Sequence, residues 1–336
     1  MALHAAANIA MAVENFRGRG YASLGGLILN RRNVKNEEEK VRELYRRERR
    51  VELCFEGKRY DDIRRWGIAN NAALIFFLER SELKFCSVEE VLEKYNRLVQ
   101  ETAEFMYSFA TYDELEGRYV LKGAIPAQET LRAAETINPP FELSYWHFAM
   151  QTAQQWRERM GQQRSLEWDE MIDKLSPLAS NNEGLYLAAE TAIDTYKDIR
   201  YTSDHMAVLG AVGILPMNKL IREDYMKNTL HWIWDNWNWG KTWGWDYPMT
   251  AMNAARLGEP EKAVGALLMD KRTNTYLPNG HNYQDGRLRI YLPGNGGLLT
   301  AIAMMCAGWD GCTETNPGFP KDGTWNVRWE GLKPLP

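Results

Sequence analysis

The sequence has no run of 18 apolar residues, so we expect no helix that spans a membrane. Its start, residues 1–12, is apolar but lacks a basic stretch and a convincing cleavage site, so no export signal is visible. Cysteine is scarce, and Cys54, Cys86, Cys306 and Cys312 form no metal-type C-x-x-C spacing. These absences predict a globular protein with free thiols, with a Cys306–Cys312 bridge as the alternative.

Strand patterns are almost absent as well. Alternation of apolar and polar residues is visible only at 118–121 and 287–291. Helical stripes dominate, and Ser87 and Glu90 form a capping box before a stripe of about 20 residues. Further helices are expected at 36–55, 60–66, 71–83, 141–160, 165–175, 184–198, 203–213, 220–236, 247–257, 259–269 and 297–308. The pattern predicts an all-α protein.

Charge divides the chain into two parts. The net charge is −4, but residues 1–68 hold 15 Lys and Arg against 10 Asp and Glu, or +5, which leaves −9 for the rest. Such a change indicates two segments of different origin. We therefore expect a first segment at 1–68, a helical domain at 69–315 and a C-terminal extension at 316–336.

The first segment carries a recognisable motif, VRELYRRERRVELCFEGKRYDDIRRWG, at residues 41–67. It resembles the C-terminal signature of SusD/RagB-type proteins, which are outer-membrane lipoproteins of Bacteroidetes that bind glycans beside a transporter. The resemblance implies a periplasmic or outer-membrane location and a glycan-uptake system as partner. The arginines of the motif alternate with glutamates that pair with them along a solvated helix, and no aromatics are interleaved for base stacking, so no nucleic acid is expected.

A long irregular loop lies between two predicted helices within the stretch from Trp243 to Gly311. It is rich in amides, aromatics and glycines, and six of the 13 tryptophans crowd into Trp232–Trp245 just before it. A polar, aromatic loop held by rigid helices suits a pocket that grips many hydroxyl groups. The alternative is an ordered loop that only turns the chain.

Three runs in this region, GWDYPMTAMNAARLGEPEKA, NTYLPNGHNYQ and LPGNGGLLTAIAMM, carry a second resemblance. They are similar to the end of the catalytic domain of helical-barrel glycosidases. The nearest group is glycoside hydrolase family 65 (trehalose, maltose and kojibiose phosphorylases and hydrolases), followed by the family 95 α-L-fucosidases and α-galactosidases. The resemblance implies an (α/α)6 barrel of six helical hairpins. Too few helices are expected after residue 69 to complete it, so we expect a partial barrel.

Glycoside hydrolysis needs a carboxylic acid that protonates the leaving oxygen. Glu129 is the main candidate, because it lies in a loop after Pro126 between two predicted helices, where apolar neighbours would raise its pKa. The segment also resembles the loop that carries the general acid in the family 65 group. Glu135 and Glu142 are its rivals.

The second carboxylate is predicted to be Asp246, between Trp245 and Tyr247 at a loop-to-helix entry. A helix cap is the other reading of Asp246, and Asp285 is a weaker candidate for the base. The family 95 pattern has an Asp before the Gly-Asn of its loop, where this chain has Pro293. The Ser cluster and the His of the family 65 phosphate site are also missing, which favours hydrolysis by water.

Substrate binding is predicted for two tryptophans and three polar loop residues. Trp243 and Trp245 offer flat faces for sugar rings, and so do Trp237 and Trp239. At most two of these four tryptophans are expected to touch a ligand. His281, Asn282 and Asn295 offer hydrogen-bond donors and acceptors. The pair Asp204–His205 lines the pocket or caps a helix. The five histidines form no metal-type cluster, so no metal or other cofactor is expected.

Together these observations predict an O-glycosyl hydrolase that acts on α-linked glycosides by an inverting acid/base mechanism. The alternative of another class is a non-catalytic glycan-binding protein of SusD type, or an inactive glycosidase fragment.

Overall fold

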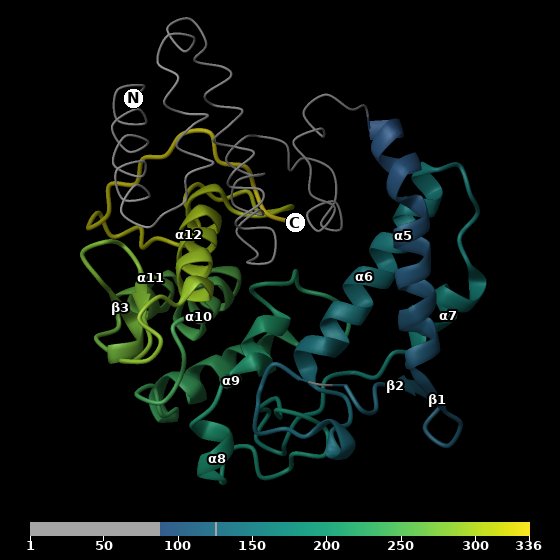
Figure 1. The fold of residues 1–336 in the computed structure, drawn as a ribbon, viewed down its shortest axis with the longest axis horizontal. Coiled ribbons are helices and arrows are strands. Elements are labelled where there is room, and N and C mark those ends of the chain that lie inside the picture. The colour runs from purple at the N-terminus through teal and green to yellow at the C-terminus, as the bar shows by residue number, and fades with distance from the viewer. Residues whose placement is uncertain (1–87, 125) are drawn as a thin grey trace, which may run out of the picture. The chain divides into compact units, whose positions relative to one another are not determined.

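The computed structural model describes residues 88–124 and 126–336, all of which belong to one of the two units into which the chain divides. The expected boundary near residue 68, the motif at 41–67, and the helices predicted at 36–55, 60–66 and 71–83 lie outside the described residues. The described part forms eight α-helices and two two-stranded antiparallel sheets, which confirms the all-α prediction (Figure 1).

The elements follow in a simple order. The helices are Val88–Phe109 (α5), Pro140–Arg159 (α6), Leu166–Lys174 (α7), Ile199–Thr202 (α8), Glu223–Asn236 (α9), Asp246–Arg256 (α10), Pro260–Leu268 (α11) and Leu292–Ala307 (α12). Short 3-10 turns lie at Ala133–Glu135 (η3), Ala207–Ala211 (η4) and Arg272–Asn274 (η5). The strands are Thr111–Asp113 (β1), Arg118–Val120 (β2), Thr275–Tyr276 (β3) and Asn282–Tyr283 (β4), paired β1–β2 and β3–β4.

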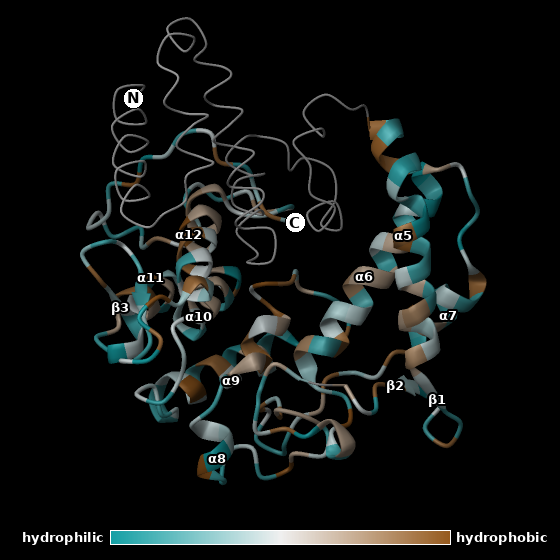
Figure 2. Cartoon of the chain, in the orientation of Figure 1, coloured by the Kyte–Doolittle hydropathy of each residue, from teal (hydrophilic) through white to brown (hydrophobic). Residues whose placement is uncertain are grey.

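Helix starts follow local chemistry. Pro140 and Pro260 occupy the first turn of α6 and α11, where a missing N–H costs nothing. Ser165 caps α7 by accepting the N–H of Trp168. In α5 the buried residues recur at helical spacing and face α6, and Figure 2 shows the mixed hydropathy of both helices. Among the described residues no helix has the length and apolar character needed to cross a bilayer.

Three predicted elements are wrong. The stretch 184–198 is not a helix, because the N–H groups of Tyr186 and Leu187 donate to the Thr229 hydroxyl and the Ala179 carbonyl instead of bonding along the chain. Its residues from Gly184 to Ala189 are all buried, so contacts from several sides replace a single apolar stripe. The expected helix at 203–213 is reduced to η4, after which Gly213 turns with φ 138° against Asn253.

The third wrong prediction is the strand expected at 287–291, because this segment is irregular. The carboxylate of Asp285 accepts the N–H groups of Arg287 and Leu288 at 2.8 and 2.9 Å and fixes a turn there. The strand pairing of this loop lies instead in β3 and β4.

Helix α10 lies at the centre of the C-terminal half. It packs against α11, α12, α9 and η4, and α11 and α12 lie beside it in Figure 1. The ten residues from Asp246 to Ala255 are all buried, out of eleven in the helix. A helix that is buried on all sides cannot be amphipathic, and its alanines allow neighbouring helices to approach closely. Any polar side chain on α10 therefore needs an internal partner.

Arg118 joins the β1–β2 hairpin to the irregular segment after α7. Its guanidinium binds both oxygens of Glu190 at 2.7 and 2.9 Å, and Asn138 donates to the same carboxylate at 2.7 Å. These bonds, the one from Arg118 foremost, hold the pKa of Glu190 below its ordinary value. The pair connects segments that share no helix or strand.

We expect Glu190→Gln to lower the free energy of unfolding by about 1 kcal/mol at pH 7, because a neutral amide replaces the carboxylate in the bidentate pair with Arg118. The loss is modest because solvent partly screens the charges of this pair. A depressed folded pKa gives stability that is present above the unfolded value of 4.5 and is lost as pH falls through the folded one. The difference from wild type should therefore shrink below that pH in urea titrations. Glu101→Gln, in an exposed pair with Arg97, is the control and should change little. A constant difference down to the lowest pH would contradict the assignment.

Candidate functional site

A buried imidazole–carboxylate pair marks the N-terminal end of α10. Nδ1 of His205 lies 3.0 and 3.2 Å from the two oxygens of Asp246. The side chains are almost fully removed from solvent, with 6% and 0% exposed. The two residues come from separate parts of the chain, the loop after α8 and the first turn of α10.

The carboxylate of Asp246 is held by an imidazole and a backbone N–H. The N–H of Trp243 donates to its Oδ2 at 2.8 Å, as an acid in the first turn of a helix often accepts from the preceding loop. Burial raises the pKa of Asp246, and the bonds from His205 and Trp243 oppose that rise without cancelling it. The side chain has no solvent exposure.

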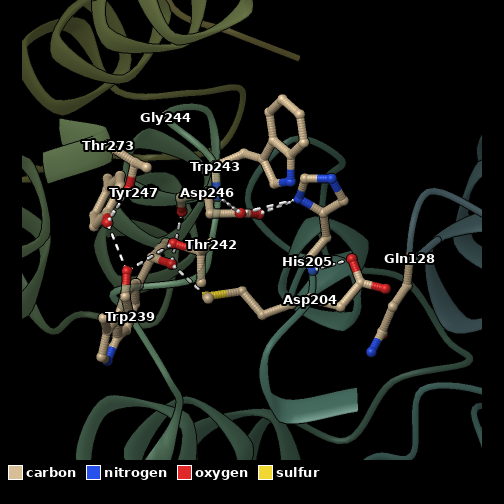
Figure 3. Close-up of polar contacts among 12 residues, drawn as sticks. Gln128, Asp204, His205, Trp239, Thr242, Trp243, Gly244, Asp246, Tyr247 and Thr273 are labelled. Atoms are coloured by element: carbon tan, nitrogen blue, oxygen red, sulfur yellow. Dashed lines mark hydrogen bonds and ion pairs between the residues drawn. The ribbon is translucent and has the colours of Figure 1, made fainter. Parts of the chain in front are cut away.

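The imidazole of His205 has one nitrogen in use and one without a partner. Burial lowers its pKa, but the bond and charge of Asp246, with smaller contributions from Asp204 and Glu129, outweigh burial, so the pKa of His205 is raised. Among the residues that the structure describes, Nε2 has no hydrogen-bond partner. Nδ1 faces the Asp246 carboxylate in Figure 3, which leaves Nε2 on the other side of the ring.

Aromatic rings surround the pair. The rings of Trp245 and Trp243 lie 4.8 and 5.9 Å from the imidazole, and Tyr291 lies 5.5 Å from Trp243. Burial raises the pKa of Tyr291, and the charges of Asp246 and Glu129 add to the rise. Trp237 and Trp239 are buried in the core instead. Two of the four neighbouring tryptophans thus border His205.

Glu129 lies in an anchored loop near this pair. On one side, the amide of Gln128 donates to the Tyr201 carbonyl at 3.1 Å, and on the other the N–H of Thr130 donates to Asp204 at 2.6 Å. The apolar surroundings expected for Glu129 are wrong, because its side chain is exposed. Its charge acts on both His205 and Tyr291. Glu129 and Asp246 therefore belong to one cluster of charges.

The rival carboxylates have other contacts. Glu142, in the first turn of α6, accepts the N–H of Ala127 at 3.2 Å, and burial raises the pKa of Glu142. Glu135 is exposed at the end of η3. Asp285 accepts two N–H groups of its own turn, which lower the pKa of Asp285. Glu142 therefore holds the loop of Glu129 through the N–H of Ala127. Asp285 holds the turn that leads to Tyr291 through the N–H groups of Arg287 and Leu288.

The polar residues predicted to bind substrate hold the loop itself. The amide of Asn282 is buried and donates to the carbonyls of Thr273 and Thr275. Asn295 accepts the N–H of Asn282 at 2.9 Å and donates to Gly280 at 2.7 Å. His281 lies beside Asn282 in the same loop and is half-buried. The donors of both asparagines are thus used within the loop.

Gln284 connects this loop to the tryptophan loop. Its Oε1 accepts the N–H of Gly244 at 2.9 Å, and its Nε2 donates to the Thr242 carbonyl at 3.3 Å. Sequence reasoning missed Gln284 and Tyr291, and it named Asp204 and His205 only as a pair that lines a pocket or caps a helix. The one available signal was the position of Tyr291 directly before the LPGNGG run.

Metal ligands are not grouped in the described part of the chain. Over residues 88–124 and 126–336, no three His, Cys, Asp or Glu side chains are placed to hold an ion. Cys306 and Cys312 are both free thiols. The side chains grouped at this site are carboxylates, one imidazole and aromatic rings.

Comparison with known proteins finds one family match and one similar solved structure. Residues 19–120 match the model of the SusD family, which confirms the resemblance of the first segment. The match covers less than half of the chain. It includes α5 and the β1–β2 hairpin. A solved structure of a putative kojibiose phosphorylase from human microbiome is similar over 63% of this chain and 33% of its own, with 10% identity and a TM-score of 0.43. This chain spans about a third of the length of that protein. Proteins of the SusD family are typically associated with the outer membrane.

The contact between the two site loops allows no side chain at Gly244. A Cβ there would lie 1.9 Å from Oδ1 of Asn282 and 2.9 Å from the Thr273 carbonyl. We expect Gly244→Ala to cost about 1–3 kcal/mol and lower the melting temperature by several degrees in a thermal scan.

Gly240→Ala is the matched control, because its Cβ would meet only Asn238 at 3.8 Å, an ordinary contact. It should melt close to wild type. Equal melting temperatures for both variants would show that Asn282 moves freely, which would contradict the packing of the two loops.

Proposed function

We propose that the described region belongs to a glycoside hydrolase that cleaves α-linked glycosides by inversion. The observation that carries this proposal is the grouping of exposed Glu129 with the buried His205–Asp246 pair beside Trp243 and Tyr291. An exposed acid and a separately held proton acceptor are the two groups that such a reaction needs. The aromatic rings suit the C–H faces of a sugar.

In this proposal Glu129 donates its proton to the glycosidic oxygen as the bond to the anomeric carbon breaks. Its exposure lets a substrate reach it, and the bonds of Gln128 and Thr130 fix the loop on either side. Asp246 acts on the opposite side, where water attacks. Because Asp246 is fully buried, it serves there through His205, its partner. Inversion needs room for a water between the two sides, about 6.5–9.5 Å between carboxyl groups.

The charge of the site favours water over phosphate as the attacking group. The charges that act on Tyr291 are those of Asp246 and Glu129, and those that act on His205 come from these two and Asp204. Even with Glu129 protonated as the acid, the charges of Asp204 and Asp246 around one imidazole repel an anion in a poorly screened site. The proposal is therefore an O-glycosyl hydrolase with a neutral glycoside as substrate, and not a phosphorylase.

The match to the SusD family favours a second candidate. Residues 19–120 would then contribute non-catalytic glycan binding, in a periplasmic or outer-membrane setting beside a glycan-uptake system. Binding of glycans without turnover would identify this function. The two candidates are compatible if binding and cleavage reside in different parts of the chain.

Replacing Glu129 by Gln tests the proposed acid. The amide cannot donate the proton, so we expect kcat on unactivated α-glucosides, α-galactosides or α-fucosides to fall about 10²- to 10⁴-fold with binding retained. Released sugar is measured for each glycoside, and NMR of the first-formed anomer reports inversion. Glu135→Gln, an exposed neighbour on the same loop, should keep full activity.

Two outcomes would go against the proposal. Unchanged turnover by the Glu129 variant would remove Glu129 from the acid role. Glycan binding by wild type with no turnover of any glycoside would favour the binding function instead.

A further inference from the structure

The imidazole of His205 is bound to protein through one nitrogen and not through the other. Its side chain is 6% exposed, yet Nε2 has no partner among residues 88–124 and 126–336. A ring nitrogen that no protein group occupies can accept a hydrogen bond from water or from a ligand. The position beside Trp243, Trp245 and the charge of Glu129 points to the proposed substrate site.

We propose that Nε2 of His205 is the general base of this site and that Asp246 is its positioning residue. This inference rests on the proposed function, because it names the group that takes the proton from the attacking water. Asp246 touches no solvent and therefore cannot take that proton itself. Its carboxylate accepts the Nδ1–H bond, which leaves the lone pair on Nε2 free to accept a proton.

The proposed reaction forms one bond to the anomeric carbon and breaks another. Water oxygen bonds to the anomeric carbon while the bond from that carbon to the leaving oxygen breaks. One proton of the water moves to Nε2 of His205, and the proton of the Glu129 carboxyl moves to the leaving oxygen. Both products carry a hydroxyl group, His205 ends protonated and Glu129 ends ionised. A proton passes from His205 to solvent and another from solvent to Glu129, which restores the starting state.

The surrounding groups determine how this base responds to pH. Asp246 faces the imidazole of His205 from α10, and Asp204 faces it from the loop that carries His205. Glu129 acts on the imidazole from the loop before η3. Tyr291 lies beyond Trp243. The three carboxylates favour the protonated ring, so activity should rise with pH as His205 loses its proton. Removing the charge of Asp246 lowers the pKa of His205, which moves this rising limb to lower pH.

His205→Asn is the sharpest variant, because its amide nitrogen lies near the position of Nδ1 and still donates to Asp246. It removes only the ring edge that carries Nε2. We expect kcat to fall about 10²- to 10⁴-fold with little change in KM, and the rising limb of the pH profile to disappear. His231→Asn is the control, since His231 makes a carboxylate pair with Glu259 on the surface at 3.0 Å.

Asp246→Asn tests the positioning role by a different route. The amide of Asn would donate to Nδ1 and place the ring proton on Nε2, the wrong tautomer for a base. We expect a loss of kcat of similar size and, by NMR titration of the imidazole, a lower pKa for His205. Thermal unfolding shows whether each variant is folded.

The outcomes separate the two proposals. Wild type that cleaves no glycoside rejects the proposed function and the base with it. A cleaving wild type whose His205→Asn variant keeps kcat and the rising limb rejects the base alone. A variant that loses stability but retains kcat and the pH profile shows a structural role and also overturns the inference.

Discussion

The buried carboxylate of Asp246 is the constraint on which the C-terminal half depends. Taking an ion out of water costs several kcal/mol unless hydrogen bonds and nearby charges compensate. Here the N-terminal end of α10, the Trp243 N–H and the His205 ring supply that compensation. The position of His205 and the conformation of the tryptophan loop are therefore coupled to the first turn of one helix.

The loops around this pair are fixed by side chains that never touch it. Asp204 accepts the N–H groups of Thr130 and His205 at 2.6 Å each, with opposite oxygens. One carboxylate thus ties the loop of Glu129 to the loop of His205. Gln284 does the same for Gly244 and the segment that leads to Tyr291. Irregular segments can hold side chains precisely when their polar backbone groups are satisfied in this way.

The sequence predicted what depends on local pattern and missed what depends on distant contacts. The bounds of α10 and α11 follow from apolar spacing and from Pro260, and both were predicted within a residue or two. Asp246 was singled out because it stands at a helix entry between two aromatics. Its partner lies 41 residues earlier in the chain, and no periodicity relates the two positions.

The amides show why residue type alone does not assign a role. Asn282 and Asn295 suit the binding of hydroxyl groups as well as they suit the bonding of a loop, and sequence cannot distinguish these roles. The deciding information is the space around them: Gly244 and Gly294 pack against the Asn282 side chain, with room for no Cβ. The same kind of argument explains the failed helix at 184–198, where a run of six buried residues has neighbours on every side.

Burial then separates the roles that two carboxylates of equal chemistry can take. Glu129 is exposed and reaches solvent, whereas Asp246 is sealed behind an imidazole and two indoles. A sealed carboxylate can exchange protons only through its partner, so the ring between them carries any exchange with the outside. The pair is thus suited to hold a proton for the duration of a reaction and then release it toward solvent through Nε2.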